Sequence, residues 1–269
     1  MFEQIINDIE TKLNVKIDKE TIEHYKEGKS DSIVISLEDK YLIKTVDENT
    51  YKTQKKFLTF YEDIDNFQKI LCDSSDLKYI CYKFMFGEKL EKIDDIDPYK
   101  IVDDLYVITN SYKKFESQGF GYLEEADKSW DTFLSDEVEY GYYELIELSI
   151  PMEKVNKALE KIKSYEVDKY LIHGDFGTHN FLFDNDYINV IDPMPVVGDR
   201  LYDFYYAVTS DVRIFNKVDI NYILSFYDDD MEYKKLLFII CLYIRMSRAY
   251  KYDRGSFKTY KDLYLNFEL

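Results

Sequence analysis

Apolar residues recur along this chain with two periods, the three-to-four-residue period of helices and the two-residue period of strands. Residues 2–13 show the helical period and predict an amphipathic helix. Two candidate strands follow, Ser32–Leu37 and Tyr41–Val46, and a short polar turn joins them into a hairpin. The helical period returns over Tyr51–Asp63, and Leu77–Phe84 is an apolar, aromatic strand candidate. The pattern therefore predicts a small first lobe built on an antiparallel sheet.

The pattern breaks at Phe86-Gly87-Glu88-Lys89-Leu90, so we place a lobe boundary near Phe86 and expect lobes of residues 1–86 and 87–269. Helices dominate the second lobe, which makes the expected class α+β. One helix should open at Pro98 and reach Glu116, and others should begin after Ser129 as cap and at Pro151. Later elements are expected as two strands, Phe181–Phe183 and Tyr187–Ile191, and as helices near residues 199–210, 219–227, 231–251 and 256–267.

Charge narrows the possible partners. The formal net charge of −18 repels the phosphates of nucleic acid and of anionic lipid, so neither is expected to bind. The same charge would attract a cationic small molecule, although a strongly charged surface also serves solubility alone. The longest apolar stretch, Leu236–Ile244, is too short to span a bilayer and reads as a buried helix.

The cysteines and the first residues bear on the compartment. Cys72, Cys81 and Cys241 are widely spaced and form no Cys-x-x-Cys pair, which favours reduced thiols over disulfides or a zinc site. No basic, apolar, small-residue series opens the chain. A cytoplasmic protein is expected, and the oligomeric state is left open.

One run carries most of the candidate chemistry. Leu171–Asn180 reads as a strand and a loop in which His173, Asp175 and Asn180 have the spacing His-x-Asp-x4-Asn, and Asp192 follows the next pair of strands. Phosphoryl transfer from a nucleotide uses one carboxylate to receive the acceptor hydroxyl, and an Asn with a second carboxylate to hold Mg²⁺. Asp175 is therefore the candidate base, and Asn180 and Asp192 are the candidate metal ligands.

These motifs resemble the aminoglycoside phosphotransferase and choline kinase family, the small-molecule branch of the protein-kinase-like fold. That branch carries His-Gly-Asp where protein kinases carry His-Arg-Asp, and a downstream Gly-Asp-x-x-x-Asp-Phe element, which is Gly198–Phe204 here. The wording His-Gly-Asp-Phe-Gly-Thr-His-Asn is similar to the hygromycin phosphotransferase side. The resemblance implies a two-lobe fold, with a nucleotide-binding lobe of residues 1–86 and a catalytic and acceptor-binding lobe of residues 87–269.

The resemblance also implies a nucleotide site. Lys44, on a predicted strand, matches the phosphate-binding lysine of the family. Gly28 and Ser30 belong to the candidate loop over the phosphates, where backbone amides and hydroxyls bind anions. Lys83 and Phe84 would form the hinge that offers backbone groups to the base. The donor is expected to be ATP or GTP, since a bulky Tyr82 before the hinge can gate the base pocket.

Further residues are expected to support the site, around the catalytic loop and beside Lys44. His173, Asp199 and Asp203 should position the loop, one aspartate by binding its backbone and the other by capping the next helix. His179 receives no role. The lysine partner departs from the family pattern, because Gln54 stands where the family has a helix glutamate, and the nearest carboxylates are Glu48 and Glu62.

The sequence thus predicts a Mg²⁺-dependent kinase that transfers the γ-phosphate to a hydroxyl of a small molecule. The segment Asp94–Glu147 is rich in acidic residues, which suits an aminoglycoside-like cationic antibiotic and a role in resistance. A metabolic acceptor such as choline or a sugar is the first alternative. A nucleotide-binding pseudokinase that acts as a binding module is the second.

Overall fold

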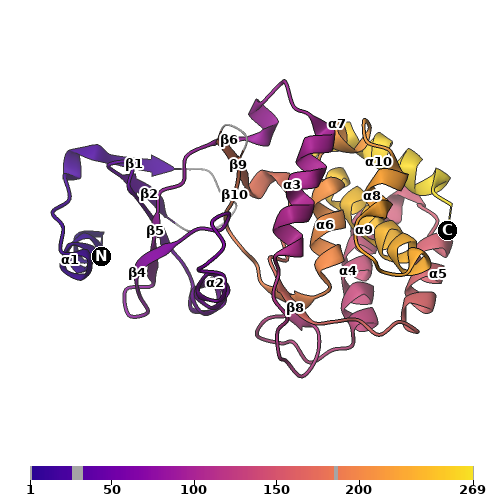
Figure 1. The fold of residues 1–269 in the computed structure, drawn as a ribbon, viewed down its shortest axis with the longest axis horizontal. Coiled ribbons are helices and arrows are strands. Elements are labelled where there is room, and N and C mark those ends of the chain that lie inside the picture. The colour runs from indigo at the N-terminus through magenta and orange to yellow at the C-terminus, as the bar shows by residue number, and fades with distance from the viewer. Residues whose placement is uncertain (1, 26–32, 185–186, 269) are drawn as a thin grey trace. The chain divides into compact units, whose positions relative to one another are not determined.

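The computed structural model describes residues 2–25, 33–184 and 187–268, and it divides into two compact units (Figure 1). The first unit comprises Met1–Lys92 and Asn180–Met194, and the second comprises Ile93–His179 and Pro195–Leu269. The first is built around an antiparallel sheet and the second is mainly helical, so the predicted α+β class is confirmed. The assignment of nucleotide binding to residues 1–86 and of catalysis to residues 87–269 stays a prediction.

Five antiparallel strands form the main sheet of the first unit, in the order β1 (Ile22–Tyr25), β2 (Val34–Leu37), β3 (Tyr41–Thr45), β5 (Tyr79–Lys83) and β4 (Ile70–Ser74). The predicted hairpin is β2–β3. Its turn residues Glu38 and Asp39 both have positive φ angles, of 54° and 51°, the sign that a tight type I′ hairpin turn requires. The edge strands β1 and β4 were not predicted, because an edge strand buries too little of either face to show a clear period.

One helix packs on each face of this sheet. Helix α1 (Phe2–Leu13) has the predicted bounds, and its residues Ile5, Ile6 and Ile9 are buried against strand residues such as Ile43. Helix α2 (Glu48–Phe60) lies on the other face, where Tyr82 of β5 reaches it. It begins before the predicted Tyr51, because the Asp47 side chain accepts a hydrogen bond from the Thr50 amide and caps the first turn.

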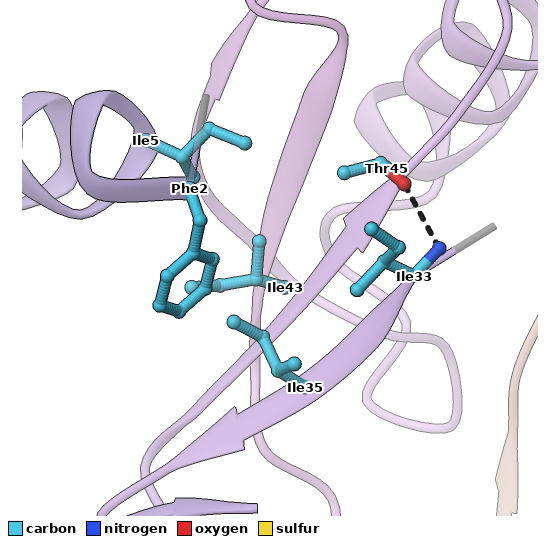
Figure 2. A pocket seen from close by; sticks show the side chains of 6 residues that line it. All are labelled: Phe2, Ile5, Ile33, Ile35, Ile43 and Thr45. Atoms are coloured by element: carbon cyan, nitrogen blue, oxygen red, sulfur yellow. Dashed lines mark hydrogen bonds between the residues drawn. The ribbon is translucent and has the colours of Figure 1, made fainter. Parts of the chain in front are cut away.

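A small apolar pocket lies between α1 and the sheet (Figure 2). Its lining comprises Phe2, Ile5, Ile33, Ile35, Ile43 and Thr45. Because neighbouring side chains on a strand point to opposite faces, this pocket and Lys44 lie on opposite faces of β3. The pocket is therefore not the candidate phosphate site.

A second sheet of the first unit joins β6 (Glu88–Lys89), β9 (Phe181–Asp184) and β10 (Tyr187–Val190), in the order β10-β9-β6. The backbone at Gly87 approaches β9 closely, since a Cβ there would lie 2.9 Å from the Phe183 carbonyl. Its φ of 142° also favours glycine. The segment that breaks the sequence pattern at Phe86–Leu90 is therefore the place where the chain pairs with β9, the strand that follows Asn180.

The second unit surrounds one long helix, α9 (Met231–Tyr252), which packs against α4 (Trp130–Leu145), α5 (Glu153–Ile162), α6 (Arg200–Val208) and α10 (Arg254–Asn266). Nearly all of its residues from Leu236 to Ile244 are fully buried, as the apolar run predicts. Helices α3 (Pro98–Asn110), α7 (Val212–Phe215) and α8 (Ile220–Ser225) complete the helical part. Within the described ranges, no helix has the length and hydropathy needed to cross a membrane.

Two predicted helix bounds in this unit are wrong, and one short helix was not predicted. Helix α3 ends at Asn110 and not at Glu116, because the following segment leaves the helix to pair with β8 (Tyr170–Ile172): the Phe115 amide donates to Lys169 O at 2.9 Å. Helix α5 begins after Met152 and not at Pro151, and α7 was not predicted. Strand β8 also pairs with β11 (Val196–Gly198), which in turn pairs with β7 (Gly121–Tyr122).

Candidate active site

Lys44 and Asp192 form an ion pair inside the first unit. The Lys44 Nζ atom lies 2.5 Å from Asp192 Oδ1, although 148 positions separate the two residues in the sequence. The Lys44 side chain is 15% exposed and that of Asp192 is 48% exposed. Strand β3 therefore points its lysine at the carboxylate that the sequence motifs nominated as a candidate metal ligand.

The hairpin β9–β10 brings Asn180 beside the backbone that leads into Asp192. Val190 is the register partner of Phe181, and the Ile191 amide donates to Asn180 O at 3.0 Å. Asn180 is 6% exposed. Asp192 has a φ of 59°, a left-handed conformation that aspartate tolerates better than most residues. Asn180 and Asp192 thus flank the open end of one hairpin, as predicted from their spacing.

These residues fit a hard divalent cation that a nucleotide brings with it. An amide oxygen and a carboxylate are ligands that Mg²⁺ prefers, and Mg²⁺ commonly takes one or two protein ligands together with substrate phosphates. Among residues 2–25, 33–184 and 187–268, no side chain bonds the second carboxylate oxygen of Asp192, Oδ2. The same ranges contain no cluster of three or more His, Cys, Asp or Glu side chains placed to hold a metal. A cation here would depend on the phosphates.

The partner of Lys44 is Asp192 and none of the three residues considered from the sequence. Gln54 donates from Nε2 to Asp192 Oδ1 at 2.7 Å, and so binds the partner of the lysine. Glu48 pairs instead with Lys52 at 2.6 Å, and Glu62 is exposed. The sequence offered no signal for this arrangement, because Asp192 is remote along the chain.

The hinge residues use their amides within the main sheet. The Lys83 amide donates to Lys69 O and the Phe84 amide donates to Lys40 O, each at 2.8 Å. These two amides would have to exchange partners to contact a nucleotide base. Gly28 and Ser30, the predicted phosphate-loop residues, lie outside the described residues.

In the second unit, Asp203 holds the start of the predicted catalytic loop. Its carboxylate accepts hydrogen bonds from the amides of His173 at 2.7 Å and Gly174 at 3.1 Å, and from the Tyr112 hydroxyl at 2.8 Å. Gly174 has a φ of 80°, which lets the loop turn directly after β8. Burial raises the pKa of Asp203 to about 7, against these hydrogen bonds, which favour the charged form.

Asp199 plays the other supporting part that was predicted. Its side chain caps helix α6 by accepting from the Leu201 amide at 3.0 Å, and it also accepts from the Tyr233 hydroxyl. Burial raises its pKa to about 6. The two aspartates of the Gly-Asp-x-x-x-Asp-Phe element are thus structural, one for the helix and one for the loop.

Asp175 has two neighbours that sequence reasoning did not assign. His179 Nε2 lies 3.1 Å from Asp175 Oδ2, and the Tyr206 hydroxyl donates to Asp175 Oδ1 at 3.4 Å. The Arg245 guanidinium lies over the Tyr206 ring, 4.9 Å from its centroid. The ring of His179 occupies the space beside Gly177, where a Cβ would lie 2.7 Å from it. The only sequence signal was a histidine four positions after the candidate base.

Comparison with known proteins identifies the fold. No family model matches the sequence, and no curated protein matches it. The ADP-bound aminoglycoside phosphotransferase APH(2'')-Ib superposes with a TM-score of 0.58 at 16% identity, over 98% of this chain and 96% of that one. A ternary complex of APH(4)-Ia with AMP-PNP and hygromycin B gives 0.60 at 14%, over 97% and 96%. A candidate fructosamine-3-kinase from Thermobifida fusca gives 0.62 at 11%, over 98% and 99%.

These scores are similar, so the expected closeness to the hygromycin phosphotransferase side stays a prediction. At such identities the likeness is one of fold. It spans nearly the whole of each chain, and it agrees with the resemblance seen in the sequence motifs. The chain therefore has the protein-kinase-like fold of the aminoglycoside phosphotransferases.

Proposed function

We propose that this protein is a small-molecule kinase that transfers the γ-phosphate of ATP or GTP to an acceptor hydroxyl. The observation that carries the proposal is the ion pair between Lys44 and Asp192, at 2.5 Å. The pair joins the residue we propose as phosphate clamp to the residue we propose as metal ligand, which were chosen from separate motifs. Solved structures of the same fold carry ADP, ATP, GDP or AMP-PNP, which supports a nucleotide donor.

Each residue has a defined part in the proposed reaction. Asp175 accepts a hydrogen bond from the acceptor hydroxyl and directs its oxygen at the γ-phosphate. Lys44 turns from Asp192 to the phosphate oxygens and balances their charge. A divalent cation held by Asn180 and Asp192 would supply further charge neutralisation at the phosphates. Asp203 keeps the Asp175 loop in place through its bonds to the loop backbone.

For the acceptor we propose a cationic, aminoglycoside-like molecule. Neighbouring structures are complexes with gentamicin, streptomycin, kanamycin or hygromycin B, and this chain carries a net charge of −18. The acidic segment Asp94–Glu147 supports the proposal less than its composition suggests. At least four of its carboxylates are already paired with lysine or arginine in the described structure: Asp104, Asp136, Glu137 and Glu144.

A metabolic acceptor is the second candidate, because one neighbour of the same fold is a candidate fructosamine-3-kinase. The acceptor can be identified by incubating the protein with ATP or GTP, Mg²⁺ and a panel of aminoglycosides, choline and sugars. Mass spectrometry then detects addition of one phosphate. Asp175→Asn is the matched control, because it keeps the size and polarity of the side chain.

Phosphorylated aminoglycosides with the wild type alone are the expected result. A phosphorylated sugar or choline, with aminoglycosides unchanged, would replace the acceptor and keep the kinase. Nucleotide binding without any phosphate transfer across the panel would favour the pseudokinase alternative.

A further inference from the structure

The buried side chain of Gln54 connects Tyr82, the residue before the predicted hinge, with Asp192, the candidate metal ligand. Gln54 lies on α2 and is 3% exposed. Its Nε2 donates to Asp192 Oδ1 at 2.7 Å and to Pro193 O at 3.1 Å, and its Oε1 accepts from the Tyr82 hydroxyl at 3.0 Å. All the hydrogen-bonding atoms of one side-chain amide are therefore used, inside a single unit of the protein.

This environment requires an amide and disfavours a glutamate. Asp192 Oδ1 and Pro193 O can only accept hydrogen bonds, so the NH₂ group must face them. A glutamate would place a carboxylate oxygen against both, and like charges in contact would repel. Burial and the charge of Asp192 hold the pKa of Tyr82 well above its usual range, so the hydroxyl keeps its proton and donates to the amide oxygen. The departure from the family pattern thus matches its surroundings.

We propose that Gln54 is a positioning residue, oriented by Tyr82, that holds Asp192 for a nucleotide-bound cation and leaves Lys44 to the phosphates. This inference rests on the proposed kinase function and extends it. A glutamate on this helix would hold the lysine, whereas Gln54 holds the metal-ligating carboxylate itself.

The geometry explains how the Asp192 carboxylate can keep its orientation both without nucleotide and with nucleotide bound. Asp192 Oδ1 receives both Lys44 and Gln54, so it keeps the amide donor when the lysine moves to phosphate. The Asp192 amide donates to Gln68 Oε1 at 3.3 Å, a second amide side chain that restrains the same residue. The carboxylate therefore does not have to reorganise when the nucleotide binds, which is the purpose of a preorganised site.

The test measures the gain in nucleotide affinity that Mg²⁺ provides. ATP and GTP are titrated against each variant in Mg²⁺ and again in a chelator, and the ratio of the two Kd values is the Mg²⁺ enhancement. Gln54→Met keeps a long unbranched side chain in the buried position but removes the donor and the acceptor. A hydrogen bond to a charged group is stronger than one between neutral groups, so we expect the enhancement to fall about ten-fold. Affinity in chelator should change little.

Tyr82→Phe tests the hydrogen bond from the Tyr82 hydroxyl to Gln54 Oε1. It should lower the enhancement by a smaller, few-fold factor, because Gln54 keeps its bonds to Asp192 but loses its fixed orientation. In the Gln54→Met background the same change should have no further effect. Tyr79→Phe is the matched control, since Tyr79 is fully buried on the same strand and its hydroxyl donates to Asp8 at 2.6 Å, away from this network. It should keep the wild-type enhancement.

The outcomes separate this inference from the function on which it rests. Wild-type protein without any Mg²⁺-dependent nucleotide affinity would overturn both. Wild-type enhancement that persists in Gln54→Met would overturn the positioning role alone, even if the variant melts earlier. An enhancement in Gln54→Glu at or above that of the wild type would show that residue 54 acts as a partner of Lys44. If Gln54→Met does not fold, Tyr82→Phe behaving like Tyr79→Phe would still refute the proposal.

Discussion

A methyl group added at Gly177 should displace the His179 ring from Asp175. A Cβ at this position would lie 2.7 Å from His179 Cε1, 2.8 Å from its Nδ1 and 3.4 Å from Tyr206 Cε1. Carbon atoms pack comfortably at about 3.5–4.0 Å, so the imidazole has to retreat by roughly 1 Å. The His179 side chain is 52% exposed, so the ring can swing towards solvent while the backbone stays in place.

The distances set the size of the effect. His179 Nε2 lies 3.1 Å from Asp175 Oδ2, close to the long end of the hydrogen-bond range, so a retreat of roughly 1 Å breaks the contact. A half-exposed bond to a carboxylate contributes about 1 kcal/mol, which corresponds to about five-fold in rate if the bond orients the base. We therefore expect Gly177→Ala to lower kcat about five-fold. Gly177 itself is buried, but the atoms nearest to the new methyl group belong to the half-exposed His179 side chain, which can move away, so the free energy of unfolding should change by less than about 0.5 kcal/mol.

A double-mutant cycle checks this reasoning. The rate of phosphate transfer, or of intrinsic nucleotide hydrolysis where no acceptor is used, is measured for Gly177→Ala, His179→Ala and the pair. Because the methyl group acts by moving the imidazole, it should have no effect once the imidazole is absent. A five-fold loss that remains in the His179→Ala background would show that Gly177 acts through the backbone, and an unchanged rate in both single variants would remove His179 from the site.

Three further predictions follow from the loop and its supports. Asp175→Asn should abolish phosphate transfer and leave nucleotide affinity within a few-fold, because the carboxylate acts mainly in the transition state; single-turnover rates and nucleotide titration measure both, and near-normal turnover would remove Asp175 as the base. Gly198→Ala should lower the free energy of unfolding by about 1–3 kcal/mol, because a Cβ there would lie 2.9 Å from a side chain of β8. Gly255→Ala, at an exposed position of α10, should not destabilise the protein. Urea unfolding should show this difference, and equal free energies of unfolding for the two variants would contradict the packing at Gly198. Burial raises the pKa of Asp203 from 3.8 to about 7 and that of Asp199 from 3.8 to about 6, so the folded state binds more protons than the unfolded state. The free energy of unfolding should therefore fall as pH rises from about 4 to about 7. Measured across this range, it should decline more steeply for the wild type than for Asp199→Asn, and parallel pH profiles would refute the burial of that charge.

Local pattern was sufficient for elements that bury one clear face. Helix α1 has the predicted bounds, and the hairpin β2–β3 forms around the predicted turn, because their apolar spacing and turn residues act over a few positions. The edge strands β1 and β4 did not show such a period. Helix α3 ended early because the chain beyond Asn110 pairs with β8, a partner that lies far along the sequence.

In the candidate site too, local sequence was enough for some residues, and only the fold decided the contacts of others. Spacing within Leu171–Asp192 was enough to nominate Asp175, Asn180 and Asp192, since the order of a loop, a ligand and a hairpin is local to that segment. Their roles stay predictions, as does that of Lys44. Sequence also indicated that one of Asp199 and Asp203 binds the loop backbone and the other caps the next helix, and the hydrogen bonds give the loop to Asp203 and the helix α6 to Asp199.

By itself, the sequence determined the fold class and the residues worth examining, because periodicity and motif spacing are properties of neighbouring positions. Only the tertiary structure decided which of these residues meet. It paired Lys44 with Asp192, turned the Gln54 amide towards that carboxylate and placed the His179 ring beside Asp175. The Lys44 and Gln54 contacts depend on how α2, β3 and the hairpin β9–β10 pack, which joins side chains that no local pattern relates. The His179 contact depends on how the loop after β8 folds, which the four-residue spacing alone does not fix.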